Sequence, residues 1–413
     1  MNKIIHPFLY KGKIHINSSK SYFQRALALS CLTRSDCLIL GSPDDEDVKI
    51  AIDVCRHLGM KINVSSSSVK VVGSSFPISK TINFNAGESG LCARMFGVIL
   101  SSFYEKTIIQ GKGTLLSREI DFSCLEELGV QVESIDYNLP IIINGKLSSG
   151  IINIDCSNSS QLLTGLLLVL PFLKGESILN AKGLVSRPYI DITIDVLESF
   201  GITVINNDYE KFIISGSQKS IVNRYEIEGD WSGAAFHLVG AAISGSVDVY
   251  GLNIKSFQAD KAILDALELC GAEVIINNNC IRVKKRELNS FSFDATDCPD
   301  LFPPLVALAS TCKGVSVIYG VGRLCNKESN RSLALQQEFK KIGVKITING
   351  NRMLIEGADS ILGGEVESHN DHRIAMALSI MACVASSPII VKNANVVAKS
   401  YSNFYLDLAR IYS

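Results

Sequence analysis

The stretch "LEELGVQV", Leu125–Val132, is the sequence pattern that decides the fold, because its order of helix end, glycine and strand recurs along the chain. The pattern recurs as "CRHLGMKI", "LESFGITV", "LELCGAEV" and "FKKIGVKI". The five glycines are Gly59, Gly129, Gly201, Gly271 and Gly343, at spacings of 70, 72, 70 and 72 residues. Glycine after a helix readily takes the left-handed conformation that ends it, so five helix ends are predicted. A further step of about seventy residues reaches "FYLDLARIYS", the expected last helix of a sixth unit.

A second element keeps the same period. A strand, a polar loop and an Ala/Leu-rich helix first occur in "HINSSKSYFQRALALS", His15–Ser30. Equivalent helix positions, separated by 69 and then by 70 residues each time, are Ala26, Met95, Gly165, Ala235, Leu305 and Ala375. Two patterns locked to one period predict six repeated βαβαββ-type α/β units, arranged as two similar lobes of three. We expect one lobe over residues 17–228 and the other over residues 1–16 and 229–413.

Cations stand in the loops where the repeated helices begin. Lys20 and Arg25 flank the start of the first such helix, where the helix carries a partial positive charge. Cations at this place indicate that an anion completes the site, and six such loops facing one cleft between the lobes would form an anion trap. The alternative is that each loop merely caps its helix, as serine often does. Capping explains the serines but not the arginines.

Composition limits the function classes. The chain has 413 residues and a formal net charge of −1, which gives no support to a nucleic-acid binder, so anion binding must be local. The N-terminal "MNKIIHPFLYKGK" lacks the apolar core of a signal peptide, and the apolar runs are too short to cross a membrane. Twelve cysteines occur without C-x-x-C pairs or metal spacing. We therefore expect free thiols, no metal and a cytoplasmic protein.

Nine motifs along the whole chain give a family resemblance: "SKSYFQRAL", "SGLCAR", "SSQLLTGLL", "LVSRPYIDIT", "EGDWSGAAF", "CPDLFPPL", "KESNR", "NDHRIAMA" and "AKSYSNF". In this order they make the chain similar to the 3-phosphoshikimate 1-carboxyvinyltransferases, which belong to the enolpyruvyl transferases. The resemblance implies the two-lobe inside-out α/β barrel of that family. It also implies transfer of the enolpyruvyl group of phosphoenolpyruvate to the 5-hydroxyl of shikimate 3-phosphate, by a monomer without metal or organic cofactor.

The resemblance also assigns roles to residues. The expected contacts of shikimate 3-phosphate are Lys20, Ser21, Arg25, Ser159, Ser160, Gln161, Ser186, Tyr189, Asp300 and Lys327. The expected contacts of phosphoenolpyruvate are Lys20, Gly90, Arg118, Gln161, Arg331, Arg373 and Lys399. Asp300 is expected to accept the 5-hydroxyl proton and Glu328 to protonate the enol carbon, with Lys20 as a third catalytic group.

Structural alternatives remain open for several of these residues. Asp300 could be an ordinary helix cap, and Lys327, Glu328 and Arg331 could form a solvated helix face with an i,i+3 pair. Tyr189 alone would usually be a packing residue.

The chain also departs from the family pattern. Glu88 and Leu91 stand in "GESGLCAR" where an amide and a hydroxyl are usual, and Glu119 follows Arg118 in place of proline. Asn330 and Ser402 replace an aspartate and a proline, and "RLCN" has Cys325 where an arginine is usual. These departures leave substrate affinity and the response to glyphosate open.

Three rival functions remain. UDP-N-acetylglucosamine enolpyruvyl transferase carries a cysteine where this chain has Gly113, and lacks "KESNR". A catalytically impaired homologue that only binds anionic metabolites is the second rival. A nucleic-acid end-processing enzyme is disfavoured by the neutral net charge.

Overall fold

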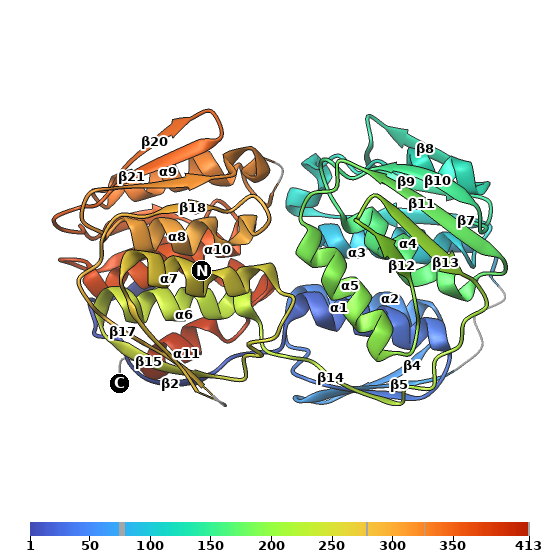
Figure 1. Cartoon of the computed structure of the whole chain (residues 1–413), viewed down its shortest axis with the longest axis horizontal. Helices are drawn as coiled ribbons and strands as arrows, with labels where there is room; N and C mark the ends of the chain where they lie inside the picture. The colour runs from blue at the N-terminus through green and yellow to red at the C-terminus, as the bar shows by residue number, and fades with distance from the viewer. Residues whose placement is uncertain (74–78, 278–279, 326, 412–413) are drawn as a thin grey trace. The chain divides into compact units, whose positions relative to one another are not determined.

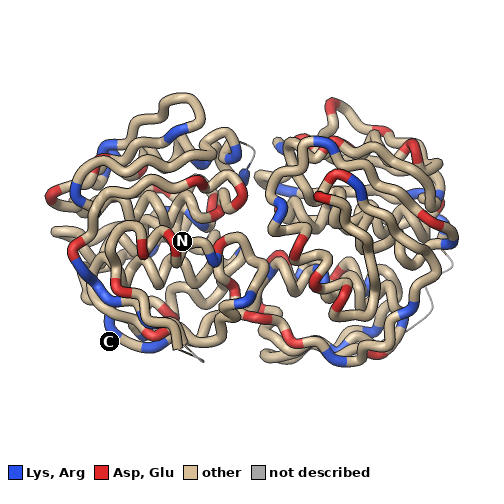
Figure 2. Tube along the Cα trace, in the orientation of Figure 1, with Lys and Arg blue, Asp and Glu red and all other residues tan. Residues whose placement is uncertain are grey.

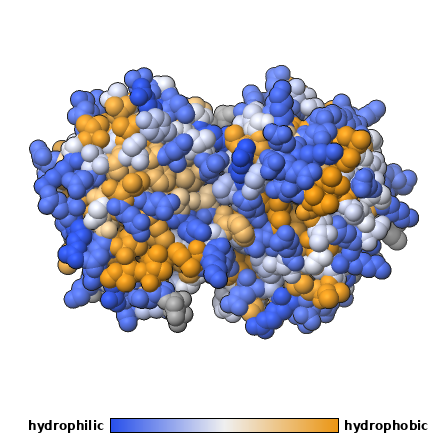
Figure 3. Space-filling model, in the orientation of Figure 1, coloured by the Kyte–Doolittle hydropathy of each residue, from blue (hydrophilic) through white to orange (hydrophobic). Residues whose placement is uncertain are grey.

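The protein is seen in a computed structural model that describes residues 1–73, 79–277, 280–325 and 327–411. The chain divides into two compact units. The first unit is Ser18–Ile227, and the second unit combines Met1–Asn17 with Glu228–Ser413. Acidic and basic residues are scattered along the chain of each of them (Figure 2). The visible face mixes hydrophilic with hydrophobic residues (Figure 3). Within the described ranges, no helix has the length and apolarity needed to cross a membrane.

The first unit contains three four-stranded sheets of one repeated topology. In each sheet the first two strands are parallel, and the third and fourth each pair antiparallel with their neighbour. The sheets, in spatial order, are β14 (Arg224–Glu226), β3 (Cys37–Leu40), β5 (Ser68–Val72) and β4 (Lys61–Val64); β6 (Thr81–Asn85), β7 (Lys106–Gln110), β9 (Asn138–Asn144) and β8 (Gln131–Ile135); and β10 (Ile151–Asp155), β11 (Glu176–Lys182), β13 (Lys211–Ser215) and β12 (Ile205–Asn207).

The second unit repeats this topology twice and then modifies it. Its sheets are β2 (Lys11–His15), β15 (Ser246–Tyr250), β17 (Cys280–Lys284) and β16 (Glu273–Ile276); β18 (Ser292–Asp294), β19 (Val315–Tyr319), β21 (Arg352–Glu356) and β20 (Lys345–Asn349); and β22 (Gly364–Glu367), β23 (Ile389–Lys392) and β1 (Lys3–Ile5). In the last sheet β1 pairs antiparallel with β23, in the place that a later strand takes in the other five. The first strand of the chain thus completes the sixth repeat.

Two strands pair outside the repeat in which the chain places them. Strand β2 directly precedes the first repeated helix, yet it pairs in parallel with β15 of the second unit. Strand β14 precedes the fourth repeated helix, yet it pairs in parallel with β3 of the first unit. Each unit therefore obtains the leading strand of its first sheet from the chain segment that enters or leaves the other half of the sequence. The six predicted repeats are confirmed, and among the described residues none of the six sheets closes into a hydrogen-bonded barrel.

One helix of each repeat lies at the centre of its unit, with the sheets outside (Figure 1). Nearly all side chains of these helices are buried. They are α1 (Lys20–Thr33), α3 (Gly90–Ser101) and α4 (Gln161–Val169) in the first unit, and α6 (Trp231–Ser244), α8 (Phe302–Ala309) and α10 (His372–Met381) in the second. A Cβ atom on Gly165 of α4 would lie 3.0 Å from the carbonyl oxygen of Met95 on α3. Met95 and Gly165, which are equivalent positions of neighbouring repeats, are thus in contact. Because a side chain at position 165 would crowd the backbone of α3, glycine is favoured there.

The remaining helices and 3-10 turns connect the sheets to this helical core. The helices are α2 (Glu46–His57), α5 (Arg187–Ser199), α7 (Ile263–Cys270), α9 (Arg331–Lys341) and α11 (Phe404–Ile411). The 3-10 turns are η1 (Gly113–Ser117), η2 (Ser123–Leu128), η3 (Leu170–Phe172), η4 (Ala259–Ala262), η5 (Pro299–Leu301), η6 (Val321–Leu324), η7 (Ala382–Val384) and η8 (Ala394–Lys399). Helix α11 is the predicted last helix of the sixth repeat. All five repeat glycines are left-handed, with φ between 75° and 91°, so their prediction as helix-ending residues is confirmed.

Candidate functional site

The residues singled out by the sequence fall into two groups, one in each unit. In the first unit, Arg25 on α1 is 1% exposed and is bonded by neutral oxygens. Its Nε donates to Thr193 Oγ1 at 2.9 Å, its Nη1 to the Ser21 carbonyl at 2.8 Å and its Nη2 to the Tyr189 carbonyl at 3.1 Å. No described carboxylate forms an ion pair with it. Burial lowers the pKa of Arg25 to about 10, because nearby tyrosines compensate only in part. A buried cation without a carboxylate is suited to receive an anion.

Lys20, the first residue of α1, lies beside an acid that the sequence did not single out. Its Nζ donates to Asp47 Oδ2 at 3.0 Å, and both side chains are largely covered. Gln24, one turn further along α1, donates from Nε2 to the Asp47 carbonyl at 2.9 Å and to Ser89 Oγ at 3.3 Å. Ser19 occupies the N-cap position of α1, but its side chain makes no capping bond. The capping alternative therefore does not explain the first loop.

Two further arginines of the first unit, Arg94 and Arg118, converge on the start of α3. A Cβ atom on Gly90 would lie 3.0 Å from Arg94 Nη1, 3.4 Å from Arg118 Nη1 and 3.5 Å from Gln161 Oε1. Arg94 Nη1 donates to Gln161 Oε1 at 3.1 Å. Burial, followed by the neighbouring charge of Arg118, lowers the pKa of Arg94 to about 10. Gly90, Arg118 and Gln161, which the family resemblance assigns to one substrate, are thus brought together, and Arg94 joins them.

Helix α4 links these arginines to Arg25. Gln161 is its first residue, and Thr164, one turn later, lies 3.5 Å from Arg25 Nη2. We call Lys20, Arg25, Arg94, Arg118 and Gln161 the first-unit cluster. It holds four cations and one amide, and only Lys20 is paired with a neighbouring carboxylate, that of Asp47, so the cluster is predominantly positive.

Three serines of the first unit stand directly before helices. Ser160 and Ser186 are the N-cap residues of α4 and α5, both are buried, and neither side chain makes a capping bond. Ser159 Oγ accepts from the Gln161 amide at 3.3 Å. Ser186 has φ 57°, an uncommon conformation for a residue other than glycine, which is often retained where function requires it.

An acid beside an anion site is unexpected, and the contacts of Glu88 give this residue a structural role. Its Oε2 accepts from the Thr114 amide at 3.0 Å and from Thr114 Oγ1 at 2.8 Å. Arg118 Nη2 in turn donates to Thr114 Oγ1 at 3.2 Å. Gly113 has φ 55°, and a Cβ atom there would collide with the Glu88 carboxylate. Glu88 therefore holds the 113–114 turn that supports Arg118.

The second unit contains a cluster centred on Arg331, the first residue of α9. Its side chain is fully buried and bonds three carboxylates. Nη1 donates to Asp300 Oδ1 at 2.8 Å, Nη2 to Glu328 Oε2 at 2.7 Å and Nε to Asp371 Oδ2 at 2.9 Å. These carboxylates raise the pKa of Arg331 against the effect of burial. The predicted alternative of a solvated helix face is therefore wrong for Arg331.

Asp300 is also paired with two further cations. Its Oδ2 lies 3.0 Å from Arg373 Nη2, and its Oδ1 lies 3.6 Å from Lys327 Nζ. Burial opposes ionisation of Asp300, but Arg373, Lys327 and Arg331 hold its pKa well below the usual value. Burial lowers the pKa of Lys327, and Asp300 offsets this in part. Because its carboxylate is bonded by cations, Asp300 is not the ordinary helix cap that the sequence left open.

Lys399 completes this group. Its Nζ donates to the Asn370 carbonyl at 2.8 Å, and its side chain is buried. Asn370 directly precedes Asp371, which caps α10 by accepting from the Arg373 amide at 2.9 Å. We call the whole group the Arg331 cluster; its members are Asp300, Lys327, Glu328, Arg331, Asp371, Arg373 and Lys399.

Sequence reasoning missed three buried acids. Asp47 and Asp371 bind Lys20 and Arg331, and Asp260 accepts a hydrogen bond from Ser232 Oγ. Burial raises the pKa of Asp260 to about 7, with Arg373 acting in the opposite direction and Asp300 reinforcing the rise. A signal existed for Asp371, which immediately precedes a helix in "NDHR", whereas the other two only become recognisable through long-range packing.

Neither cluster resembles a metal site. Across the described ranges, no group of three or more His, Cys, Asp or Glu side chains is arranged to hold a metal ion. All twelve cysteines are free thiols, and most are buried. The arrangement can instead bind anions and move protons between carboxylates and substrate.

Comparisons with known proteins agree along the whole chain. The family model described as "EPSP synthase (3-phosphoshikimate 1-carboxyvinyltransferase)" matches residues 8–408. A 3-phosphoshikimate 1-carboxyvinyltransferase of Clostridium novyi is 34% identical, over 99% of this chain and 97% of its own. One of Clostridium acetobutylicum is 35% identical, over 98% and 96%. The solved EPSP synthase of Acinetobacter baumannii superposes with a TM-score of 0.84 at 25% identity, covering 100% of this chain and 98% of that one.

Proposed function

Because the chain belongs to the EPSP synthase family, we propose that its two clusters hold the two substrates of that reaction and supply its acid and base. The protein is a 3-phosphoshikimate 1-carboxyvinyltransferase. It transfers the enolpyruvyl group of phosphoenolpyruvate to the 5-hydroxyl of shikimate 3-phosphate and releases phosphate, in the shikimate pathway to the aromatic amino acids. The predicted fold class and reaction are thereby confirmed.

Shikimate 3-phosphate is assigned to the first-unit cluster. Arg25 supports this assignment, since it is a buried cation whose described partners are all neutral. Ser159, Ser160 and Ser186 place three hydroxyl groups directly before α4 and α5. Tyr189 lies in the first turn of α5, and its carbonyl is a partner of Arg25. Further contacts are assigned to Lys20, Ser21, Gln161, Asp300 and Lys327.

Phosphoenolpyruvate is assigned to Arg331, Arg373 and Lys399. Arginine binds carboxylate and phosphate through parallel hydrogen bonds, which suits the two anionic groups of this substrate. Additional contacts are assigned to Lys20, Gly90, Arg118 and Gln161, the last three of which converge at the start of α3. The transfer joins both substrates, so both clusters must act on one substrate pair.

Asp300 is the proposed acceptor of the 5-hydroxyl proton. A carboxylate with a strongly lowered pKa is a weak base, and three cations keep Asp300 in that state. Phosphoenolpyruvate would compete with Asp300 for Arg331 and Arg373. Substrate binding would therefore raise the pKa of Asp300 at the moment when a stronger base is needed.

Glu328 is the proposed proton donor to the enol carbon. It binds the same guanidinium as Asp300 but through a different nitrogen, so Arg331 holds the two carboxyl groups at fixed positions. Both side chains are 19% exposed, which leaves them accessible to a substrate. Lys20, beside Asp47, is the third proposed catalytic group.

The decisive experiment measures phosphate release from phosphoenolpyruvate with shikimate 3-phosphate as acceptor and, separately, with UDP-N-acetylglucosamine. Release with the first acceptor alone supports the proposal, and release with the second supports the sister enzyme. Calorimetric binding of shikimate 3-phosphate without any turnover would instead indicate the impaired homologue.

The remaining proposals concern domains, assembly and location. We propose that the two units act as closing lobes, that the protein is a monomer and that it works in the cytoplasm. The twelve free cysteines support a reducing compartment. Small-angle scattering with and without shikimate 3-phosphate tests lobe closure, and an unchanged radius of gyration would contradict it.

A further inference from the structure

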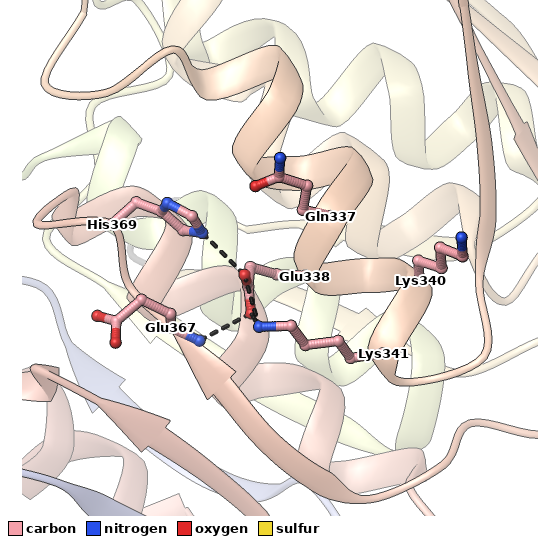
Figure 4. A pocket seen from close by; sticks show the side chains of 6 residues that line it. All are labelled: Gln337, Glu338, Lys340, Lys341, Glu367 and His369. Carbon is pink, nitrogen blue, oxygen red and sulfur yellow. Dashed lines mark hydrogen bonds and ion pairs between the residues drawn. The ribbon is translucent and has the colours of Figure 1, made fainter.

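Glu338 is a buried carboxylate outside both clusters. It lies on α9, two turns after Arg331, and is 2% exposed. Four bonds converge on its two oxygens: Lys341 Nζ donates to Oε1 at 2.8 Å and Oε2 at 2.7 Å, His369 Nε2 lies 2.8 Å from Oε1, and the Glu367 amide donates to Oε2 at 2.8 Å. In Figure 4 these residues line one pocket, and the side chains of Lys341 and His369 point towards Glu338. Burial raises the pKa of Glu338, but these donors outweigh it and lower the value overall.

Two of these donors belong to one short segment, residues 367–371, between β22 and α10. His369 and Asn370 have φ values of 52° and 56°, so two consecutive residues other than glycine are left-handed. This conformation is unfavourable for a residue other than glycine and persists only where the surroundings enforce it. The Glu367 amide and His369, which both bond Glu338, lie two residues before this left-handed pair and within it, so Glu338 can stabilise its conformation.

The segment ends in residues that orient the cations assigned to phosphoenolpyruvate. The carbonyl of Asn370 accepts from Lys399 Nζ at 2.8 Å. Asp371 accepts from Arg331 Nε at 2.9 Å and from the Arg373 amide at 2.9 Å. Two adjacent residues of one strained turn therefore bond the cationic groups of Lys399 and Arg331 and the backbone amide of Arg373.

We propose that Glu338 is a positioning residue for phosphoenolpyruvate binding: by anchoring residues 367–369 to α9, it fixes Asn370 and Asp371. These two residues in turn hold Lys399, Arg331 and the start of α10, which carries Arg373. The inference rests on the proposed assignment of Arg331, Arg373 and Lys399 to phosphoenolpyruvate. Helix α9 makes the arrangement rigid, because it carries both the anchor Glu338 and the cation Arg331.

The first test is Glu338→Gln, which keeps an acceptor for the Glu367 amide but removes the negative charge. We expect KM for phosphoenolpyruvate to rise roughly tenfold, because a small displacement of binding groups is costly. KM for shikimate 3-phosphate should stay within about twofold, because most of its assigned contacts lie in the first unit. The matched control is Glu365→Gln, which breaks an exposed ion pair with Lys392 between the neighbouring strands β22 and β23. Its KM values should equal those of the unaltered protein.

The second variant separates backbone strain from anchoring. Asparagine tolerates the left-handed conformation, but its side chain is shorter than that of His369. His369→Asn should therefore raise KM for phosphoenolpyruvate in the same direction as Glu338→Gln. KM equal to that of the unaltered protein in both variants would overturn the inference.

Hydrogen exchange provides a readout that does not depend on turnover. The Asp371 amide donates to the Ser368 carbonyl and the Arg373 amide to Asp371 Oδ1. Both amides should exchange faster in Glu338→Gln than in Glu365→Gln. Unchanged exchange overturns the positioning role even if the enzyme is active, whereas absence of phosphate release by the unaltered protein overturns only the proposed function.

Discussion

Arg331 donates to Asp300 at 2.8 Å while its own side chain has no exposed surface. The same guanidinium also bonds Glu328 and Asp371, so a single buried cation orients three carboxylates. Of the three, Asp371 is fully buried, whereas Asp300 and Glu328 are partly exposed. Asp371 thus serves as an internal support, and the other two can meet a substrate.

Asp300→Asn keeps the volume of the side chain but removes the proposed base. Turnover should fall by about a hundred- to ten-thousand-fold, which is the usual contribution of general-base catalysis. Phosphoenolpyruvate should bind as tightly as before or more tightly, since Arg331 and Arg373 lose a competing carboxylate. Single-turnover kinetics and calorimetry measure the two effects, with circular dichroism as a folding control. Turnover like that of the unaltered protein would refute the role of Asp300.

Arg25→Met tests whether a buried cation is retained for binding and not for stability. Its partners keep other bonds, since the Tyr189 carbonyl also accepts from Thr193 Oγ1 at 2.8 Å. The melting temperature should therefore stay equal or rise, because desolvation of the charge is avoided. Affinity for shikimate 3-phosphate should fall roughly ten- to hundredfold, the usual loss for a hydrogen bond to a charged group.

The control for Arg25→Met is Lys49→Met, which lies on the exposed face of α2. It should change neither the melting temperature nor the affinity for shikimate 3-phosphate. A lower melting temperature of Arg25→Met with unchanged affinity would make Arg25 a structural residue.

The sequence predicted the repeat and most charged site residues because both are local patterns. Glycine at a fixed period must end a helix, and arginine at a helix start is unusual enough to indicate an anion. The expected lobe bounds already assign the segment of β2 to the second unit and that of β14 to the first. Their partners β15 and β3 could not be predicted, since strand pairing depends on contacts between distant segments. The same holds for Asp47 and Asp260, which are recognisable only once their partners are in place.

Glu88→Ala tests the support of Arg118 through the 113–114 turn. Loss of the two bonds to Thr114 should displace Arg118 and raise KM for phosphoenolpyruvate several-fold. Glu88→Gln can still accept from Thr114, so its KM for phosphoenolpyruvate should lie close to that of the unaltered protein. The matched control is Glu119→Ala, because Arg94 bonds only the backbone carbonyl of the exposed Glu119. Equal KM values for the two alanine variants would contradict the supporting role of Glu88.

Asp260→Asn should change how stability depends on pH. Burial raises the pKa of Asp260 to about 7 in the folded protein, above its value of about 3.9 in an unfolded chain. Between these values the folded state binds more protons than the unfolded state, so stability must fall as pH rises. The contribution of Asp260 is complete below the unfolded pKa and is lost as pH rises through about 7, with a slope of at most about 1.4 kcal/mol per pH unit.

Asparagine cannot ionise, and its amide oxygen can still accept from Ser232, so the variant should lack this decline. Urea unfolding of the unaltered protein and of the variant between about pH 4 and pH 8.5 measures this decline. The two free energies of unfolding should agree at the acidic end, and that of Asp260→Asn should be the larger towards the alkaline end. Asp265→Asn, which alters an exposed carboxylate on α7, serves as the control and should follow the unaltered protein. Curves for Asp260→Asn that run parallel to those of the unaltered protein across this range would show that Asp260 is already ionised at acidic pH, with Arg373 compensating for its burial.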